Sequence, residues 1–209
     1  MCRVRMRFSK TGSLRFIGHL DFLRVFQQTI RRAGLPAAFS QGFNPHLQIS
    51  FALPLPLGME SVNDYADLTL TEELSPAEIV EKLNAVAPSG LLVKAAYAAE
   101  NKAASVVSVA DYILNIPVIS PEEILQQDKI IIAKKTKKGI KDTDIRPDIL
   151  SLELQGSAVL MRLSAGSSRF LNPVTVAELI AVEGEKPSVA NISRIELYQE
   201  NENGKIITL

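Results

Sequence analysis

Apolar and polar residues alternate strictly at the start of the chain, which predicts a β-strand over residues 2–8. One face of this strand is apolar and the other carries three arginines, so we expect a buried apolar face and an open arginine face. Between residues 19 and 33 the apolar positions recur every three or four residues, which predicts an amphipathic helix. Arg24 and Arg31 fall on the polar side of that helix.

Strand-like patterns follow at 47–53 and 65–70. The segment 75–78, Ser-Pro-Ala-Glu, predicts the start of a second helix, because serine caps a helix, proline suits its first turn and glutamate completes a capping box. A further strand is predicted at 91–98. The order strand-helix-strand-strand-helix-strand is typical of the ferredoxin-like fold.

The same order of elements returns after a small, polar segment at 101–108, including a second Ser-Pro-x-Glu helix start at 120–123. We therefore expect an α+β protein of two tandem ferredoxin-like (βαββαβ) units with antiparallel sheets, residues 1–100 and 108–209. The second unit should contain a mobile basic loop at 134–148. Sequence similarity between the halves is weak, so the duplication depends on element order alone.

Basic and acidic residues are concentrated in different segments, although the chain as a whole is neutral, with 23 of each. Residues 1–50 carry eight Arg and Lys and one acid, Asp21, and residues 129–150 carry seven basic and three acidic residues. Cationic segments in a neutral protein favour a localised anion-binding face, and we expect the anion to be RNA. The alternative is that these segments simply face solvent and bind no ligand.

Several classes of protein are excluded by what the sequence lacks. No apolar run reaches the roughly 20 residues that span a bilayer, and the start of the chain has no secretory signal pattern, so we expect a cytoplasmic protein without membrane contact. The single cysteine, Cys2, excludes an internal disulfide and a cysteine-ligated metal. Phosphate-loop, dinucleotide and serine-hydrolase motifs are absent, so we expect no metal and no cofactor.

The first candidate site is the connection at 10–19. Two glycines, two hydroxyl residues and two cations precede a predicted helix start, where free N–H groups suit a phosphate. The candidate residues are Lys10, Thr11, Ser13, Arg15 and His19. The alternative is an ordinary connection whose hydroxyl groups cap turns.

The second candidate site is the polar loop at 40–46. Phe43 offers a ring for stacking on a base, while Gln41, Asn44 and His46 offer hydrogen-bonding groups. The alternative places Phe43 in the core and the polar groups in turn bonds. The nearby helix stripe containing Arg24 and Arg31 either follows a nucleic-acid backbone or faces solvent.

The third candidate is the lysine-rich segment at 134–146, which cannot pack a core and is predicted to grip phosphates as a flexible loop. Its candidate residues are Lys134, Lys135, Lys137, Lys138, Lys141 and Arg146. The alternative is a solubilising loop. Elsewhere, Asp64 and Asp67 should lie on opposite faces of a strand, which argues against joint acid–base or magnesium chemistry.

Three segments together carry a family resemblance. They are Phe8-Ser9-Lys10-Thr11-Gly12 with Gly18-His19-Leu20-Asp21, then 39–46 (Phe-Ser-Gln-Gly-Phe-Asn-Pro-His) with 50–58 (Ser-Phe-Ala-Leu-Pro-Leu-Pro-Leu-Gly), and 137–146 (Lys-Lys-Gly-Ile-Lys-Asp-Thr-Asp-Ile-Arg). Over nearly its whole length the chain resembles the radical-SAM-linked proteins, a bacterial family of unknown function. The resemblance implies a radical-SAM partner in a separate chain, because one cysteine cannot complete that enzyme's three-cysteine cluster.

Three functions follow as expectations. The first is a non-catalytic RNA-binding module that presents tRNA or rRNA to the radical-SAM partner. The second comes from a similarity of the tandem arrangement to the Cas6-like endoribonucleases, and makes His19 or His46 the catalytic group of a metal-independent cleavage, with Lys10 or Arg15 stabilising charge. That arrangement is also similar to the tRNA pseudouridine synthases, whose Arg-Thr-Asp signature is absent. The third is a protein-interaction adaptor without RNA binding.

Overall fold

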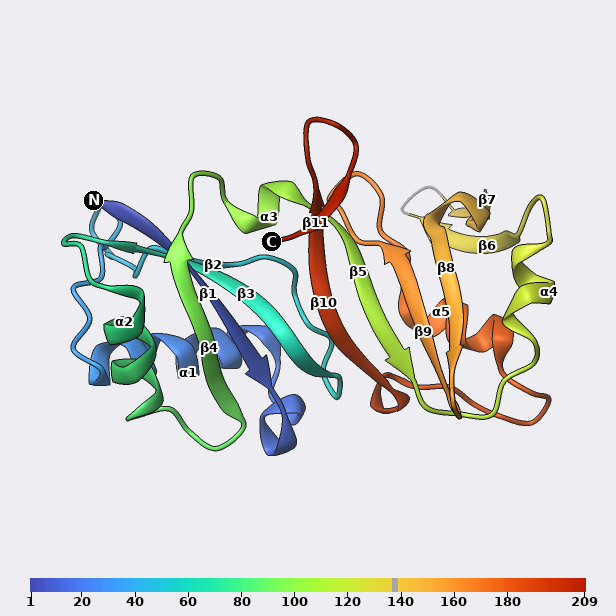
Figure 1. Cartoon of the computed structure of the whole chain (residues 1–209), viewed down its shortest axis with the longest axis horizontal. Helices are drawn as coiled ribbons and strands as arrows, with labels where there is room; N and C mark the ends of the chain where they lie inside the picture. The colour runs from blue at the N-terminus through green and yellow to red at the C-terminus, as the bar shows by residue number, and fades with distance from the viewer. Residues whose placement is uncertain (137–138) are drawn as a thin grey trace.

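A continuous sheet runs along the long axis of the molecule, with helices packed against it (Figure 1). The computed structural model describes residues 1–136 and 139–209, and only the backbone at 135–136. The protein is a mixed α+β protein whose large sheet is mostly antiparallel, with five α-helices in the described part of the chain. No helix among the described residues is long and apolar enough to cross a membrane.

The large sheet has the order β4-β1-β3-β10-β5-β9-β8, with β2 paired to β3 and β11 paired to β10. Its strands are β1 (Cys2–Lys10), β2 (Ile49–Phe51), β3 (Glu60–Leu70), β4 (Leu91–Ala98), β5 (Val107–Leu114), β8 (Ile149–Gln155), β9 (Ala158–Ser164), β10 (Ile192–Glu200) and β11 (Ile206–Thr208). A separate two-stranded sheet contains β6 (Ile131–Thr136) and β7 (Gly139–Asp144). The helices are α1 (His19–Arg32), α2 (Pro76–Asn84), α3 (Ala103–Val106), α4 (Pro121–Leu125) and α5 (Pro173–Ile180), with 3-10 turns η1 (Gly12–Phe16), η2 (Arg146–Asp148) and η3 (Val189–Asn191).

The first half of the chain contributes the neighbouring strands β4-β1-β3-β2, which are all antiparallel. The apolar face predicted for β1 is buried, and α1 packs on it. The rings of Phe22 and Phe26 on α1 lie 5.8 and 5.1 Å from that of Phe8. The predicted cap of α2 is confirmed, because the Ser75 hydroxyl accepts a hydrogen bond from the Glu78 backbone N–H at 3.2 Å.

The second half contributes the strands β10-β5-β9-β8, again all antiparallel, and α5 covers one face of them. The halves meet where β3 runs parallel to β10, over only two residue pairs, Ser193 with Glu60 and Arg194 with Ser61. The buried apolar residues form two clusters, one beneath α1 and one centred on the second half. The second cluster also contains Ala52, Leu55, Met59 and Tyr65 of the first half, so it extends across the junction.

The structure differs from the predicted elements at three places. The segment at 134–148, expected as a mobile basic loop, instead runs through β6, β7 and η2, because the two strands satisfy each other's backbone groups without needing a core. The arginine face of β1 is not open throughout, since Arg5 is buried. The polar segment at 101–108 contains α3 and the start of β5 rather than a linker.

Candidate nucleic-acid interface

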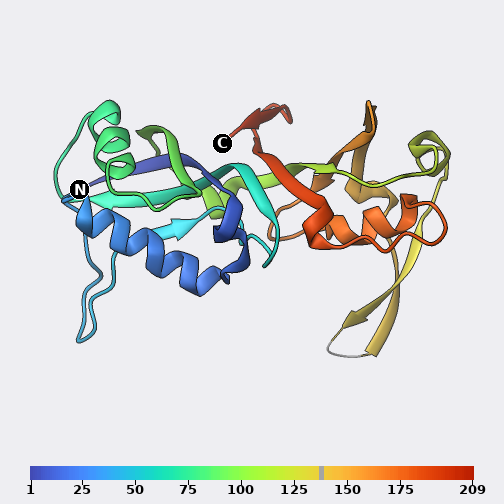
Figure 2. The ribbon, with the colours of Figure 1, turned by 90° about the horizontal axis from the view of Figure 1, so that it is seen from below.

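Two segments project from the body of the molecule on the same side, as Figure 2 shows. One is the connection between α1 and β2, and the other is the β6–β7 hairpin. They lie at opposite ends of the long axis, with α1 between them. The polar 40–46 loop and the lysine-rich segment therefore share a side of the molecule but do not meet in one compact site.

The first projection presents an aromatic ring to solvent. Its base is closed by a bridge between Phe39 and Leu47 and by two hydrogen bonds between Ser40 and His46, at 2.8 and 3.0 Å. At its tip, Phe43 is fully exposed, at 106% of its reference area. Gln41 and Asn44 are also exposed. The alternative that Phe43 belongs to the core is therefore excluded.

The second projection pairs two lysines across strands. In the register of β6 and β7, Lys134 lies directly opposite Lys141, and both are exposed. Like charges at directly opposed positions repel each other, and an isolated two-stranded ribbon is only marginally stable. An anion bound between the two ammonium groups would remove that repulsion.

A cleft of about 400 Å³ lies between this hairpin and the start of α5. The hairpin contributes Ile132, Lys134 and Thr143 to the lining, and the opposite wall includes Phe170 and Asn172. Phe170 is 45% exposed, so its ring is accessible for stacking. A cation, an aromatic ring and polar groups around one cleft are the components of a nucleotide-binding surface.

Arg146, another member of the lysine-rich segment, has a different position from that expected. The Arg146 guanidinium donates to the carbonyl oxygens of Ile149 and Leu125, at 3.1 and 2.9 Å, so it anchors the base of the hairpin rather than facing a ligand. Lys135 belongs to β6, but only the backbone of this residue is described. Lys137 and Lys138 lie outside the described residues.

Lys10 lies inside the protein instead of on the expected cationic surface. It is 1% exposed, its ammonium donates to the Ile17 carbonyl oxygen at 3.0 Å, and it lies 4.8 Å from the centre of the Phe22 ring. Burial lowers the pKa of this ammonium, and the nearby Asp64 carboxylate opposes the shift. Lys10 therefore holds the 10–19 segment in place and is not available to a phosphate at the surface.

The rest of the 10–19 segment already binds an anionic group of the protein itself, the Glu60 carboxylate. The Gly12 backbone N–H donates to a Glu60 carboxylate oxygen at 2.9 Å, and the Arg15 guanidinium lies 3.8 Å from the same oxygen. Arg15 also lies over the ring of Phe16, which is 62% exposed. Ser13 is exposed, while Thr11 is half-buried and its backbone N–H donates to Gly90. A carboxylate thus sits where the sequence predicts a phosphate.

The two histidines lie at opposite ends of α1. His19 is the first residue of the helix and packs its ring 5.5 Å from that of Phe51, whereas His46 belongs to the loop beyond the other end (Figure 2). They are therefore too far apart to act as an acid–base pair. Along the same helix, Arg24 is paired with Asp21 at 2.8 Å, and Arg31 is exposed.

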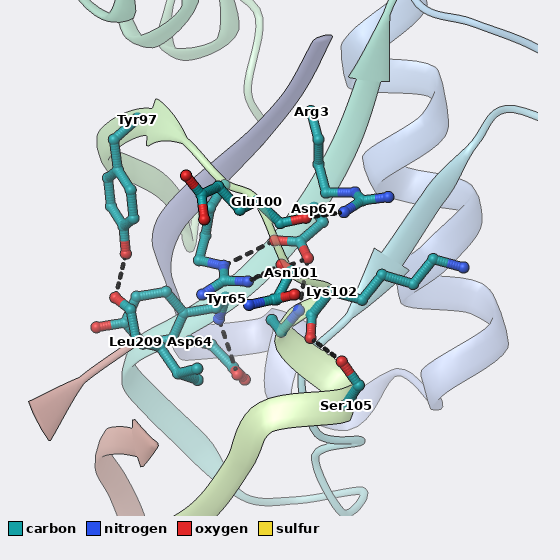
Figure 3. Close-up of polar contacts among 12 residues, drawn as sticks. Arg3, Asp64, Tyr65, Asp67, Tyr97, Glu100, Asn101, Lys102, Ser105 and Leu209 are labelled. Carbon is teal, nitrogen blue, oxygen red and sulfur yellow. Dashed lines mark hydrogen bonds and ion pairs between the residues drawn. The ribbon is translucent and has the colours of Figure 1, made fainter. Parts of the chain in front are cut away.

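Asp64 and Asp67 lie on opposite faces of β3, as predicted, and each is buried against an arginine. Asp67 accepts from Arg5 at 2.8 Å and from the Ala103 backbone N–H at 2.6 Å, beneath the 100–105 segment (Figure 3). Asp64 accepts from Arg194 at 2.6 Å. Both carboxylates are thus engaged by arginines, although Asp67 also lines a cavity of about 340 Å³ beside Arg3 and Lys102.

Sequence reasoning missed these ion pairs and the cleft residue Phe170. The Arg5–Asp67 pair joins cross-strand neighbours that are far apart in sequence, so no local pattern indicates it. Phe170 follows a polar segment, Ser-Ser-Arg, which was the available signal that its ring would be exposed. Among the described residues, no group of three or more His, Cys, Asp or Glu side chains is placed to hold a metal ion.

A family model described as an uncharacterised protein conserved in bacteria, DUF2344, matches residues 3–173 of the chain. The chain belongs to the DUF2344 family. No curated protein matches it. The DUF2344 match includes the β6–β7 hairpin and the start of α5, and assigns no activity to them.

Proposed function

We propose that this DUF2344 protein binds RNA without cleaving it and presents a structured RNA, tRNA or rRNA, to a radical-SAM enzyme in a separate chain. The observation that carries the proposal is the pair of same-sided projections, one ending in the fully exposed Phe43 and the other carrying Lys134 opposite Lys141. Exposed aromatic rings stack on unpaired bases, and paired ammonium groups attract phosphates.

The spacing of the projections favours an extended ligand. Because they lie at opposite ends of the long axis, a small anion contacts one of them, whereas a folded RNA spans both. The cleft beside Phe170 adds a place for a base close to the Lys134 ammonium. The proposed contact surface is thus a row of separate contacts, which suits a polyanion with regularly spaced phosphates.

The finer architecture is part of the proposal. The first half has the strand order β4-β1-β3-β2, and the second half has β10-β5-β9-β8. When the four strands of each half are numbered first to fourth along the chain, both orders read fourth-first-third-second. This equivalence supports two ferredoxin-like units, at 1–100 and 108–209, with α4 and the β6–β7 hairpin in place of the first helix of the second unit. A radical-SAM partner, on the family resemblance alone, completes the proposal. A cytoplasmic location, expected from the sequence pattern, is also part of the proposal.

The geometry weakens the ribonuclease alternative, in which His19 or His46 is the catalytic group and Lys10 or Arg15 stabilises charge. Lys10 is buried, and the Arg15 guanidinium lies 3.8 Å from a Glu60 carboxylate oxygen. The alternative of a protein adaptor that does not bind RNA offers no bound anion to offset the repulsion between Lys134 and Lys141.

The test is RNA binding by fluorescence anisotropy, using labelled tRNA and the full chain over a salt series. We expect affinity to fall steeply with salt, Phe43→Ala to weaken binding about fivefold or more, and the double variant Lys134→Gln/Lys141→Gln to flatten the salt dependence. Leu92→Ala and Lys205→Gln are matched controls, because Leu92 is an exposed apolar residue and Lys205 an exposed lysine outside the two projections. Undetectable binding at low salt, or binding unaffected by salt, contradicts the proposal.

A further inference from the structure

A second cationic cluster lies on the other face of the first-half sheet, away from α1. Arg7 on β1 points to this face, because its neighbours Met6 and Phe8 are fully buried in the core beneath α1. Among the described residues, its guanidinium has no hydrogen bond or ion pair, and its Nε is buried without an acceptor. The terminal nitrogens are not among the buried unpartnered atoms, so they reach solvent.

Arg7 differs from the other buried or half-buried arginines because none of its guanidinium nitrogens has a hydrogen bond or ion pair to a described residue. Arg3 donates to the Glu100 carbonyl oxygen, Arg5 pairs with Asp67, and Arg162 pairs with Asp111. Arg194 pairs with Asp64, although its Nε is also buried without an acceptor. A buried N–H without an acceptor costs free energy, and native structures satisfy nearly all of them. The unpaired guanidinium is therefore a group whose missing partner needs an explanation.

Lys94 on β4 is brought to the same place by a β-bulge. The β1–β4 register shifts between Arg7 and Phe8, so the alternation of β4 breaks at Lys94 and Ala95, and Lys94 points to the face that carries Arg7. Its ammonium donates to the Asn63 side-chain oxygen at 3.1 Å, and the Asn63 amide donates to the Ile195 carbonyl oxygen at 3.1 Å. The lysine is thus held in position by β3 and β10.

The two cations are close enough to affect each other. Partial burial and then the Arg7 charge lower the pKa of the Lys94 ammonium, while Glu196 raises it. Glu196 is already engaged, since its Oε1 accepts from the Tyr65 hydroxyl at 2.6 Å and from the Leu197 backbone N–H at 3.0 Å. The cluster therefore has two cations, of which Lys94 is held by Asn63, and within the described part of the chain no carboxylate is bonded to either.

We propose that Arg7 and Lys94 together bind a phosphate group on the sheet face opposite α1, where β4 and β1 lie side by side and Lys94 is exposed. The planar guanidinium supplies parallel N–H donors and the ammonium supplies a point charge, which together match a dianionic oxyanion better than a single carboxylate. Arg7 and Lys94 belong to β1 and β4, on the sheet face opposite α1, and not to the α1–β2 connection or the β6–β7 hairpin, so the site is separate from the RNA surface proposed above.

The test observes Arg7 directly, through the ¹H–¹⁵N signal of its Nε–H group in the full chain. Inorganic phosphate is titrated against chloride at equal ionic strength. We expect a saturable shift of the Arg7 signal, an affinity about tenfold lower in Lys94→Gln, and no change in Lys82→Gln, whose lysine pairs with Glu78 on α2. Thermal stabilisation by phosphate should disappear in Arg7→Gln. The exposed Lys94 variant keeps the test valid if Arg7→Gln does not fold.

Two further probes separate the sources of the phosphate. A nucleoside 5′-monophosphate that shifts the Arg7 signal, while an RNA oligomer without terminal phosphates does not, identifies a small phosphorylated ligand. An oligomer that shifts it equally identifies the nucleic-acid backbone. The proposal is overturned if none of the three probes gives a saturable shift, or if phosphate affinity is unchanged in Lys94→Gln.

Discussion

Asp67 illustrates how this protein places charged residues in its interior. Its carboxylate is 3% exposed and accepts hydrogen bonds from Arg5 and from the Ala103 backbone N–H. The same guanidinium also donates to the Asn101 carbonyl oxygen at 2.6 Å. Burying two charges is costly, but a pair whose remaining hydrogen-bonding groups are also satisfied offsets much of that cost. The pair attaches the 100–105 segment to β1 and β3.

Replacing Asp67 by asparagine should destabilise the protein by about 3–5 kcal/mol, because it leaves the Arg5 charge buried without a counter-charge. Urea denaturation followed by circular dichroism measures this loss. Asp21→Asn is the matched control: its pair with Arg24 is exposed, and such pairs contribute at most about 1 kcal/mol. A loss for Asp67→Asn no larger than that of the control would show that the buried pair contributes little.

At the scale of elements, the turn before β4 determines where the 10–19 segment lies. The Thr11 N–H donates to the Gly90 carbonyl oxygen at 2.9 Å, and Gly90 has a φ of 90°. A Cβ atom at this glycine would lie 2.3 Å from the Thr11 carbonyl oxygen. Only glycine allows the turn and the start of η1 to approach so closely.

Gly90→Ala should therefore cost more stability than the left-handed backbone alone explains. Gly184 is a matched control, since its φ is 92° but nothing lies within 4 Å of an added Cβ. We expect Gly184→Ala to cost about 1–2 kcal/mol and Gly90→Ala at least about 1 kcal/mol more. Thermal and urea unfolding of both variants measures the difference, and equal losses would mean that the Thr11 contact relaxes without cost.

Local signals predicted some elements well and others poorly. The helix at 19–33 is confirmed as α1, because a stripe of apolar residues with helical period buries against the sheet. The Ser-Pro-x-Glu signals correctly predicted α2 and the short helix α4, although Ser120 makes no capping hydrogen bond to the α4 backbone. The lysine-rich hairpin was missed because its pairing depends on a partner strand, not on burial.

The whole molecule depends on a narrow junction between its halves. Only two residue pairs join β3 to β10, and the buried ion pair between Asp64 and Arg194 spans this junction. The Arg194 guanidinium also donates to the Leu53 carbonyl oxygen at 2.9 Å. First-half residues such as Met59 and Tyr65 also pack into the second-half core, so these polar contacts act together with an apolar contact between the halves.

Asp64→Asn should weaken this junction and separate the unfolding of the two halves into two steps, because it removes the counter-charge of Arg194 and of Lys10. Asp111→Asn is the control, since its buried pair with Arg162 lies within the second half. Calorimetry should give two transitions for the first variant and one for the second. A single transition in both would mean that the apolar contacts alone couple the halves.

The sequence by itself determined which segments form the main strands and helices, and that the charge is concentrated in separate segments. Those properties follow from nearest neighbours along the chain, through periodicity, caps and turns. Only the tertiary structure decided that Lys10 and Arg5 are buried, that Phe43 is exposed and that Arg7 lies beside Lys94. The physical reason is that burial and pairing are set by residues distant in sequence, so the same arginine or lysine becomes a structural ion pair or an open binding group according to what folds over it.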